Sequence, residues 1–137
     1  MAGRSDAELL NDLVSRERRL VSAYEAALRR DAIEASLGET LLAHERAHVA
    51  ALERTLAGRG DPVASVPSPE LTAALRHRRS FALYAKQLED ELVYMYADRV
   101  PRIRDPKLRQ PLGSIMICDA SHVVALKQSM GNRFLVN

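Results

Sequence analysis

Two carboxylate–histidine pairs are the residues best placed to do chemistry. They read Glu45-Arg-Ala-His48 and Asp119-Ala-Ser-His122, with the same spacing of three positions. In a helix this spacing puts the carboxylate and the imidazole on one face, about a turn apart, where they can hold one metal ion. Mixed oxygen and nitrogen ligands suit iron or manganese better than softer metals.

A further glutamate precedes each pair, in an arrangement that repeats along the chain. Glu17 lies seven residues before Tyr24, and Glu89 lies seven residues before Tyr96. From the glutamate to the carboxylate of the following pair is 28 residues in the first half and 30 in the second. The repeat predicts two similar helical hairpins related by an approximate twofold axis. If facing ligands lie at equal depth, the hairpin turns fall near residues 31 and 104.

Apolar residues recur at steps of three and four in four segments, which predicts four amphipathic helices. We expect them at about residues 6–30, 36–58, 68–100 and 105–131. Capping boxes at Ser5–Glu8 and Ser36–Glu39 should begin the first two helices. Asp105-Pro106 should begin the fourth helix, and Gly131 should end it. Pro111 should kink the fourth helix or delay its start.

These segments predict an all-α fold, a four-helix bundle of two antiparallel hairpins in one domain over residues 1–137. No alternating strand pattern competes with the helical one. The segment 58–69 holds Gly and Pro residues and reads as an extended crossover, long enough to run the length of the bundle. Residues 131–137 form a C-terminal tail.

Six polar residues fall on the apolar stripes where the core should be. An unpaired buried carboxylate costs more than one core leucine contributes, so something must compensate them. Four carboxylates and two neutral imidazoles carry about four negative charges, which two divalent ions would cancel. The six residues are Glu17, Glu45, His48, Glu89, Asp119 and His122.

This pattern resembles the ferritin-like di-iron carboxylate superfamily, and within it the small bacterial ferritin-like domains. The resemblance runs from about Leu9 to Met130. It implies two iron ions, or manganese, held by the six residues. Glu45 and Asp119 would bridge the metals, the other two glutamates would be terminal ligands, and each histidine would bind one metal. Asp119 stands where the family usually has Glu, and its shorter side chain makes bridging of a second metal harder.

The resemblance further implies a reaction with dioxygen or peroxide, of the oxidase or peroxide-scavenging type. Tyr24 and Tyr96 could hydrogen-bond the ligands or relay an electron in such an oxidoreductase, or they could simply pack in the core. The alternative is a bundle with one metal or none, acting as a stress or interaction protein, whose carboxylates pair with Arg, His or water.

Composition restricts the function further. The 20 Lys and Arg residues nearly balance the 18 Asp and Glu residues, which does not favour a nucleic-acid partner. A mineral-storing cage is disfavoured because the chain is slightly basic and no helical pattern follows Gly131. The one cysteine, Cys118, cannot supply an electron-transfer iron site, so any electron donor must be a separate protein.

The remaining expectations concern location and assembly. A single cysteine and the lack of a signal-peptide or membrane-spanning pattern predict a cytoplasmic protein with no membrane partner. The tail segment 133–136, in which Phe, Leu and Val follow an arginine, could dock across a homodimer or cover its own bundle. His44 and His77 lie off the inner stripe and are assigned no role, and Cys118 is interpreted as a helix-packing residue.

Overall fold

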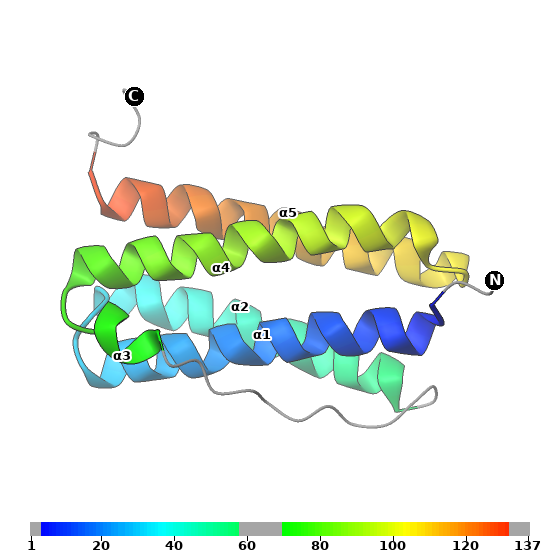
Figure 1. The fold of residues 1–137 in the computed structure, drawn as a ribbon, viewed down its shortest axis with the longest axis horizontal. Helices are drawn as coiled ribbons and strands as arrows, with labels where there is room; N and C mark the ends of the chain where they lie inside the picture. Colours follow the sequence, from blue (N-terminus) through cyan, green and yellow to red (C-terminus); the bar gives the residue numbers. More distant parts are fainter. Residues whose placement is uncertain (1–3, 58–69, 132–137) are drawn as a thin grey trace.

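Four long helices form the bundle that the sequence predicts, in a computed structural model that describes residues 4–57 and 70–131 (Figure 1). The helix α1 packs antiparallel to α2, α4 packs antiparallel to α5, and α1 also contacts α4. A short helix, α3, precedes α4, and a 3₁₀ turn over Val100–Arg102 follows it. The bounds are α1 Asp6–Arg29, α2 Ala35–Leu56, α3 Leu71–Ala74, α4 Arg78–Arg99 and α5 Pro106–Ser129.

The order of the helices gives the up-down-down-up topology expected of two hairpins joined by a crossover. The helix α2 ends at one end of the bundle and α3 lies at the other (Figure 1). The predicted connector 58–69 and the tail residues 132–137 lie outside the described residues. Within the described part of the chain, no helix has the length and apolar character needed to cross a membrane.

Helix starts follow local side-chain capping, with one correction. Ser5 accepts a hydrogen bond from the Glu8 amide, and Asp105 accepts one from the Lys107 amide, as predicted. The capping box expected at Ser36–Glu39 is wrong. The helix α2 begins at Ala35, because the Glu34 carboxylate accepts hydrogen bonds from the amides of Ser36 and Leu37.

The third predicted helix is broken, not continuous. His77 has extended backbone angles, and its amide donates to Ser80 Oγ at 3.1 Å, which starts α4 at Arg78. The same hydroxyl donates to the Ala74 carbonyl at 2.7 Å and so closes the end of α3. Two capping interactions of one serine therefore override the apolar periodicity. Pro111 does not delay α5, which begins at Pro106 and runs through it.

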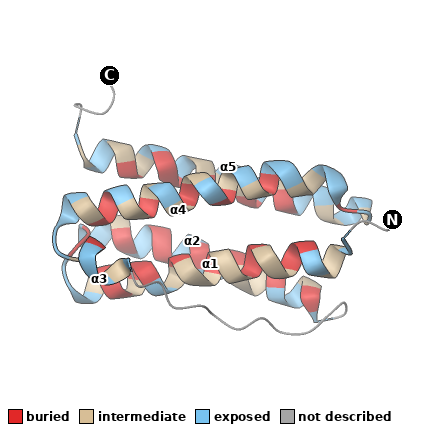
Figure 2. Ribbon diagram, in the orientation of Figure 1, coloured by how far each residue is buried: buried red, intermediate tan, exposed pale blue. Residues whose placement is uncertain are grey.

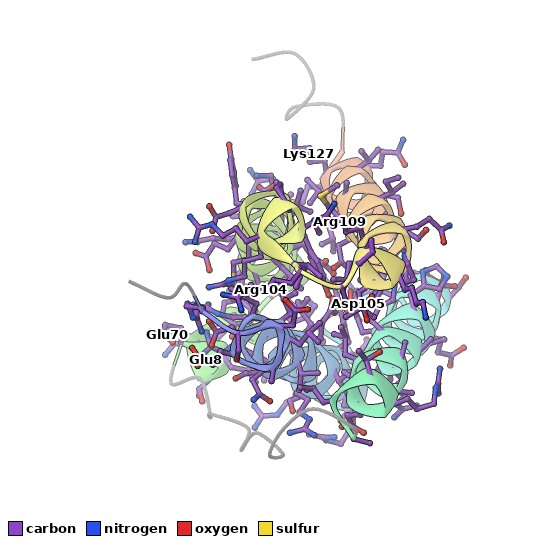
Figure 3. All side chains as sticks on the ribbon, turned by 90° about the vertical axis from the view of Figure 1, so that its right-hand side faces the viewer. Glu8, Glu70, Arg104, Asp105, Arg109 and Lys127 are labelled. Carbon is purple, nitrogen blue, oxygen red and sulfur yellow. The ribbon has the colours of Figure 1, made fainter. Side chains whose placement is uncertain are left out.

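Both hairpin turns lie where equal ligand depth predicts. Asp31, in the left-handed region at φ 55°, turns the first hairpin, and Arg78 binds its carboxylate at 2.8 Å. At the other end, the Asp6 carboxylate accepts hydrogen bonds from the amides of Arg104 and Asp105, 2.8 and 3.0 Å away. These two residues lie at the end of the bundle that faces the viewer in Figure 3. Each hairpin is thus attached to the other at both ends.

Buried residues line the inward faces of the four long helices (Figure 2). Leucine and alanine supply most of this core, as the low aromatic content predicts, and Tyr24, Phe81 and Tyr96 are its largest members. Tyr24 and Phe81 pack edge to face with their ring centroids 5.8 Å apart. Halfway along the helices, polar side chains interrupt this apolar packing.

Candidate metal centre

The structure brings all six predicted polar residues together inside the bundle. The four carboxylate residues are completely buried, His122 is 1% exposed and His48 is 8% exposed. One residue comes from α1, two from α2, one from α4 and two from α5. The three-residue spacing in α2 and α5 directs the carboxylate and the histidine of each pair to the same interior space.

The six residues form two overlapping groups, each with donor atoms close enough to bind one metal ion. Each group has one histidine and one glutamate of its own. Glu45 and Asp119 belong to both groups. The first contains Glu17, Glu45, His48 and Asp119, and the second contains Glu45, Glu89, Asp119 and His122.

Glu45 presents one oxygen to each histidine. Its Oε2 lies 3.4 Å from His48 Nδ1, and its Oε1 lies 2.8 Å from His122 Nδ1. Asp119 reaches both histidines with a single atom, because its Oδ1 lies 3.3 Å from the first and 3.7 Å from the second. The shorter side chain of Asp119 therefore still lies between the two histidines. It contacts both with one oxygen, whereas Glu45 uses a different oxygen for each.

The glutamates of α1 and α4 each face one histidine and one tyrosine. Glu17 Oε2 is 3.6 Å from His48 Nδ1, and Glu89 Oε1 is 3.0 Å from His122 Nδ1. The tyrosine bonds are crossed between the hairpins. Tyr96 donates to Glu17 Oε1, and Tyr24 donates to Glu89 Oε1, both at 2.8 Å. Each hairpin thus donates a tyrosine hydroxyl to the glutamate of the other, as the approximate twofold axis between the hairpins predicts.

Unpartnered polar atoms concentrate in this cluster. Among the described residues, eight buried side-chain nitrogen or oxygen atoms have no hydrogen-bond partner, and six of them belong to it. They come from Glu17, Glu45, His48, Glu89 and Asp119. Buried polar atoms are nearly always paired, so this concentration indicates that another group belongs among them. Five acceptor oxygens and an imidazole nitrogen are ligands that iron and manganese accept.

Burial and mutual proximity raise the pKa values of the carboxyl groups. Burial, reinforced by Glu45, raises the pKa of Glu17 to about 7. Burial likewise raises the pKa of Asp119 to about 7, although the contact with His48 opposes it. Burial also raises the pKa values of Glu45 and Glu89. Without a cation, the four carboxylates therefore resist being ionised together.

The pKa values of the two histidines are also raised, but by their carboxylate neighbours and against the effect of burial. Burial alone would lower the pKa of His122, but the hydrogen bonds to Glu45 and Glu89 outweigh it and raise the pKa to about 10. The contacts of His48 with its neighbouring carboxylates also outweigh burial and raise its pKa. Without a metal, both imidazoles carry protons that partly compensate the carboxylates. Two divalent cations would replace those protons.

Sequence reasoning missed two residues beside this cluster. His44, given no role, has its Nδ1 3.0 Å from His122 Nε2. The packing interpretation of Cys118 overlooked that its Sγ lies 3.5 Å from the same nitrogen. The spacing of four from Cys118 to His122 places them on one helix face and could have indicated this contact. His77, also given no role, helps to start α4.

Comparison with known proteins supports the same fold. A family model described as a ferritin-like domain matches residues 5–132, which is nearly the whole chain. No curated protein and no solved structure match the chain.

Proposed function

Because the chain belongs to the ferritin-like domain family, we propose that its buried cluster binds two iron ions that react with dioxygen or peroxide. The reaction would be of the oxidase or peroxide-scavenging type, with manganese as the alternative metal. The observation that carries this proposal is the set of six buried polar atoms that have no hydrogen-bond partner and belong to the two overlapping groups. In a core that served only to stabilise the fold, apolar side chains would be more stable at these positions, because an unpaired buried polar atom costs free energy.

Each residue has a role that follows from its position. Glu45 and Asp119 would bridge the two metals, because they belong to both groups. Glu17 and His48 would complete the first metal position, and Glu89 and His122 the second. When bound, the pair of ferrous ions would supply the two electrons that reduce peroxide or begin the reduction of dioxygen. A separate electron donor would be needed to restore them.

The two tyrosines would fix the terminal glutamates. Tyr24 donates to Oε1 of Glu89 and Tyr96 donates to Oε1 of Glu17, and the Oε2 atom of each glutamate has no hydrogen-bond partner. One oxygen of each glutamate is thereby oriented by a neutral donor, and the other is available for a metal. Burial raises the pKa values of both hydroxyls, so they remain protonated donors at neutral pH.

Metal content is the first test. Protein reconstituted anaerobically with ferrous iron and desalted should retain about two irons per chain, one for each donor group. Glu45→Ala should retain none, because it removes the carboxylate that faces both histidines. Dioxygen or peroxide consumption by the loaded protein, compared with the same variant, then tests the reaction.

A metal-free or singly metallated bundle is the second candidate. It is favoured by the hydrogen-bonding distances from His122 Nδ1 to Glu45 and Glu89, which a protonated histidine satisfies without metal. No iron above the Glu45→Ala level would support a metal-free interaction or stress protein. One iron per chain would indicate that Asp119 fails to complete the second position.

A further inference from the structure

A second group of donor atoms lies on the outer side of His122. The Nδ1 atom of this ring faces the carboxylates, so its Nε2 atom points away from them. There it meets His44 Nδ1 at 3.0 Å and Cys118 Sγ at 3.5 Å. The donor atoms of all three residues lie within 4.8 Å of one another. Two nitrogens and one sulfur, from α2 and α5, thus converge.

We propose that His44, Cys118 and His122 form a separate binding site for one thiophilic cation, such as zinc, with a fourth position open to solvent. Tetrahedral zinc with Zn–N of about 2.0–2.1 Å and Zn–S of about 2.3 Å places two nitrogens roughly 3.3 Å apart and a nitrogen and a sulfur roughly 3.6 Å apart. The observed separations of 3.0 and 3.5 Å are close to these values. Small side-chain movements would admit the cation.

The ring geometry also supports convergence. The planes of His44 and His122 differ by 8°, and their centroids are 5.2 Å apart. Because the nearest nitrogens are only 3.0 Å apart, the two rings meet through their nitrogen edges and not through their faces. A separation of 3.0 Å is that of a hydrogen bond between the two imidazoles, so a cation that binds both nitrogens must replace the proton between them.

The outer site is open to solvent on one side, and its ligands differ from those of the carboxylate centre. His122 is buried, Cys118 is partly buried and His44 is exposed, so a cation can enter from the His44 side. A thiolate ligand selects softer ions than carboxylates do. Zinc would therefore prefer this site, whereas iron and manganese prefer the interior.

Sharing of His122 would connect the two sites. A neutral imidazole has only one nitrogen with a free lone pair. When a cation occupies Nε2, the proton resides on Nδ1, where it can be donated to Glu45 and Glu89 at the observed 2.8 and 3.0 Å. Zinc at the outer site should therefore exclude one iron from the interior. This consequence, unlike the site itself, rests on the proposed function.

Cobalt is the probe for the site, because thiolate ligation of Co²⁺ gives a charge-transfer absorption band that carboxylates and histidines do not give. Metal-free, full-length protein should develop this band with one equivalent of Co²⁺, and Zn²⁺ should remove it. Cys118→Ser should lack the band. His44→Ala should weaken Co²⁺ binding by at least about tenfold, because one of three protein ligands is lost.

Glu45→Ala is the variant that separates this proposal from the di-iron proposal. It removes the interior bridging carboxylate but leaves the three outer ligands, so it should keep the cobalt band while it loses iron. Circular dichroism of each variant checks that the bundle is folded. Absence of the band in the wild-type protein, or its persistence with unchanged affinity in His44→Ala, would overturn the site. Two irons retained in zinc-loaded protein would overturn the sharing of His122.

Discussion

The stability of the metal-free protein should fall as the pH rises from 5 to 8. Burial raises the pKa of Glu17 from 4.5 to about 7 and that of Asp119 from 3.8 to about 7. Between the ordinary pKa and the raised pKa of each group, the folded chain binds more protons than the unfolded chain, so a rise in pH favours unfolding. The raised pKa of His122, about 10, acts in the same direction above its ordinary value of 6.5. His44 acts in the opposite direction, because partial burial and the neighbouring His122 lower its pKa.

The size of the effect follows from these values. One pKa unit corresponds to about 1.4 kcal/mol, so Glu17 alone contributes on the order of 3 kcal/mol, lost between about pH 4.5 and pH 7. For a domain of this size, 1 kcal/mol corresponds to about 4 °C in Tm. The melting temperature in chelator should therefore fall by about 10 °C or more between pH 5 and pH 8.

Metal should reverse this dependence. Metal ions bind deprotonated carboxylates and neutral imidazoles, so metal affinity rises with pH. Because the ions bind the folded chain preferentially, excess Mn²⁺ should raise Tm most at pH 8. Thermal unfolding followed by circular dichroism, with chelator and with Mn²⁺, measures both trends.

A matched variant assigns the effect to the cluster. Glu17→Gln keeps the size of the side chain but removes its ionisation, so its metal-free Tm should depend less on pH than that of the wild-type protein. A metal-free Tm that stays constant or rises from pH 5 to pH 8 would refute the reasoning, because it would mean that the buried carboxyls ionise at no cost.

Further substitutions test the hydrogen bonds and the packing of the bundle. Tyr24→Phe and Tyr96→Phe should each lower the unfolding free energy in urea by about 1–3 kcal/mol, because each removes a hydroxyl that donates to a buried glutamate oxygen. Glu89 Oε1 keeps its contact with His122, so Tyr96→Phe should cost the more; a neutral result for either would contradict the crossed bonds. Ser80→Ala should cost about 1 kcal/mol by removing the cap between α3 and α4, whereas Ser121→Ala, which loses one exposed bond within α5, should cost less. Glu45→Ala should lower the metal-free Tm, because it removes a buried carboxylate that pairs with both histidines and leaves a cavity; an unchanged or raised Tm would mean that repulsion among the carboxylates outweighs these contacts.

The fold and the inner cluster could be predicted because both follow from helical periodicity. Steps of three and four identify which residues face the core, and charged residues on those positions are conspicuous because a core excludes them. Equal depth then follows from the distance of each ligand to its turn. Helical periodicity alone thus identifies all six residues of the cluster.

Periodicity could not predict features that depend on interactions between helices or on individual hydrogen bonds. His44 lies on an exposed position of α2, and only the spacing between α2 and α5 brings it to His122. The break before α4 depends on one hydroxyl that bonds to both His77 and Ala74. The cap of α2 by Glu34 uses a residue outside the predicted helix.

The crossed tyrosine bonds make assembly of the site depend on tertiary structure. Tyr24 and Glu89 belong to different hairpins, as do Tyr96 and Glu17, so neither glutamate is oriented until the hairpins dock. Each hairpin by itself supplies only one carboxylate–histidine pair and one glutamate. A metal ion bound by either group would contact residues from both hairpins and would therefore stabilise their association, not merely the individual helices. The metal-free chain would lack that added attraction between the two hairpins.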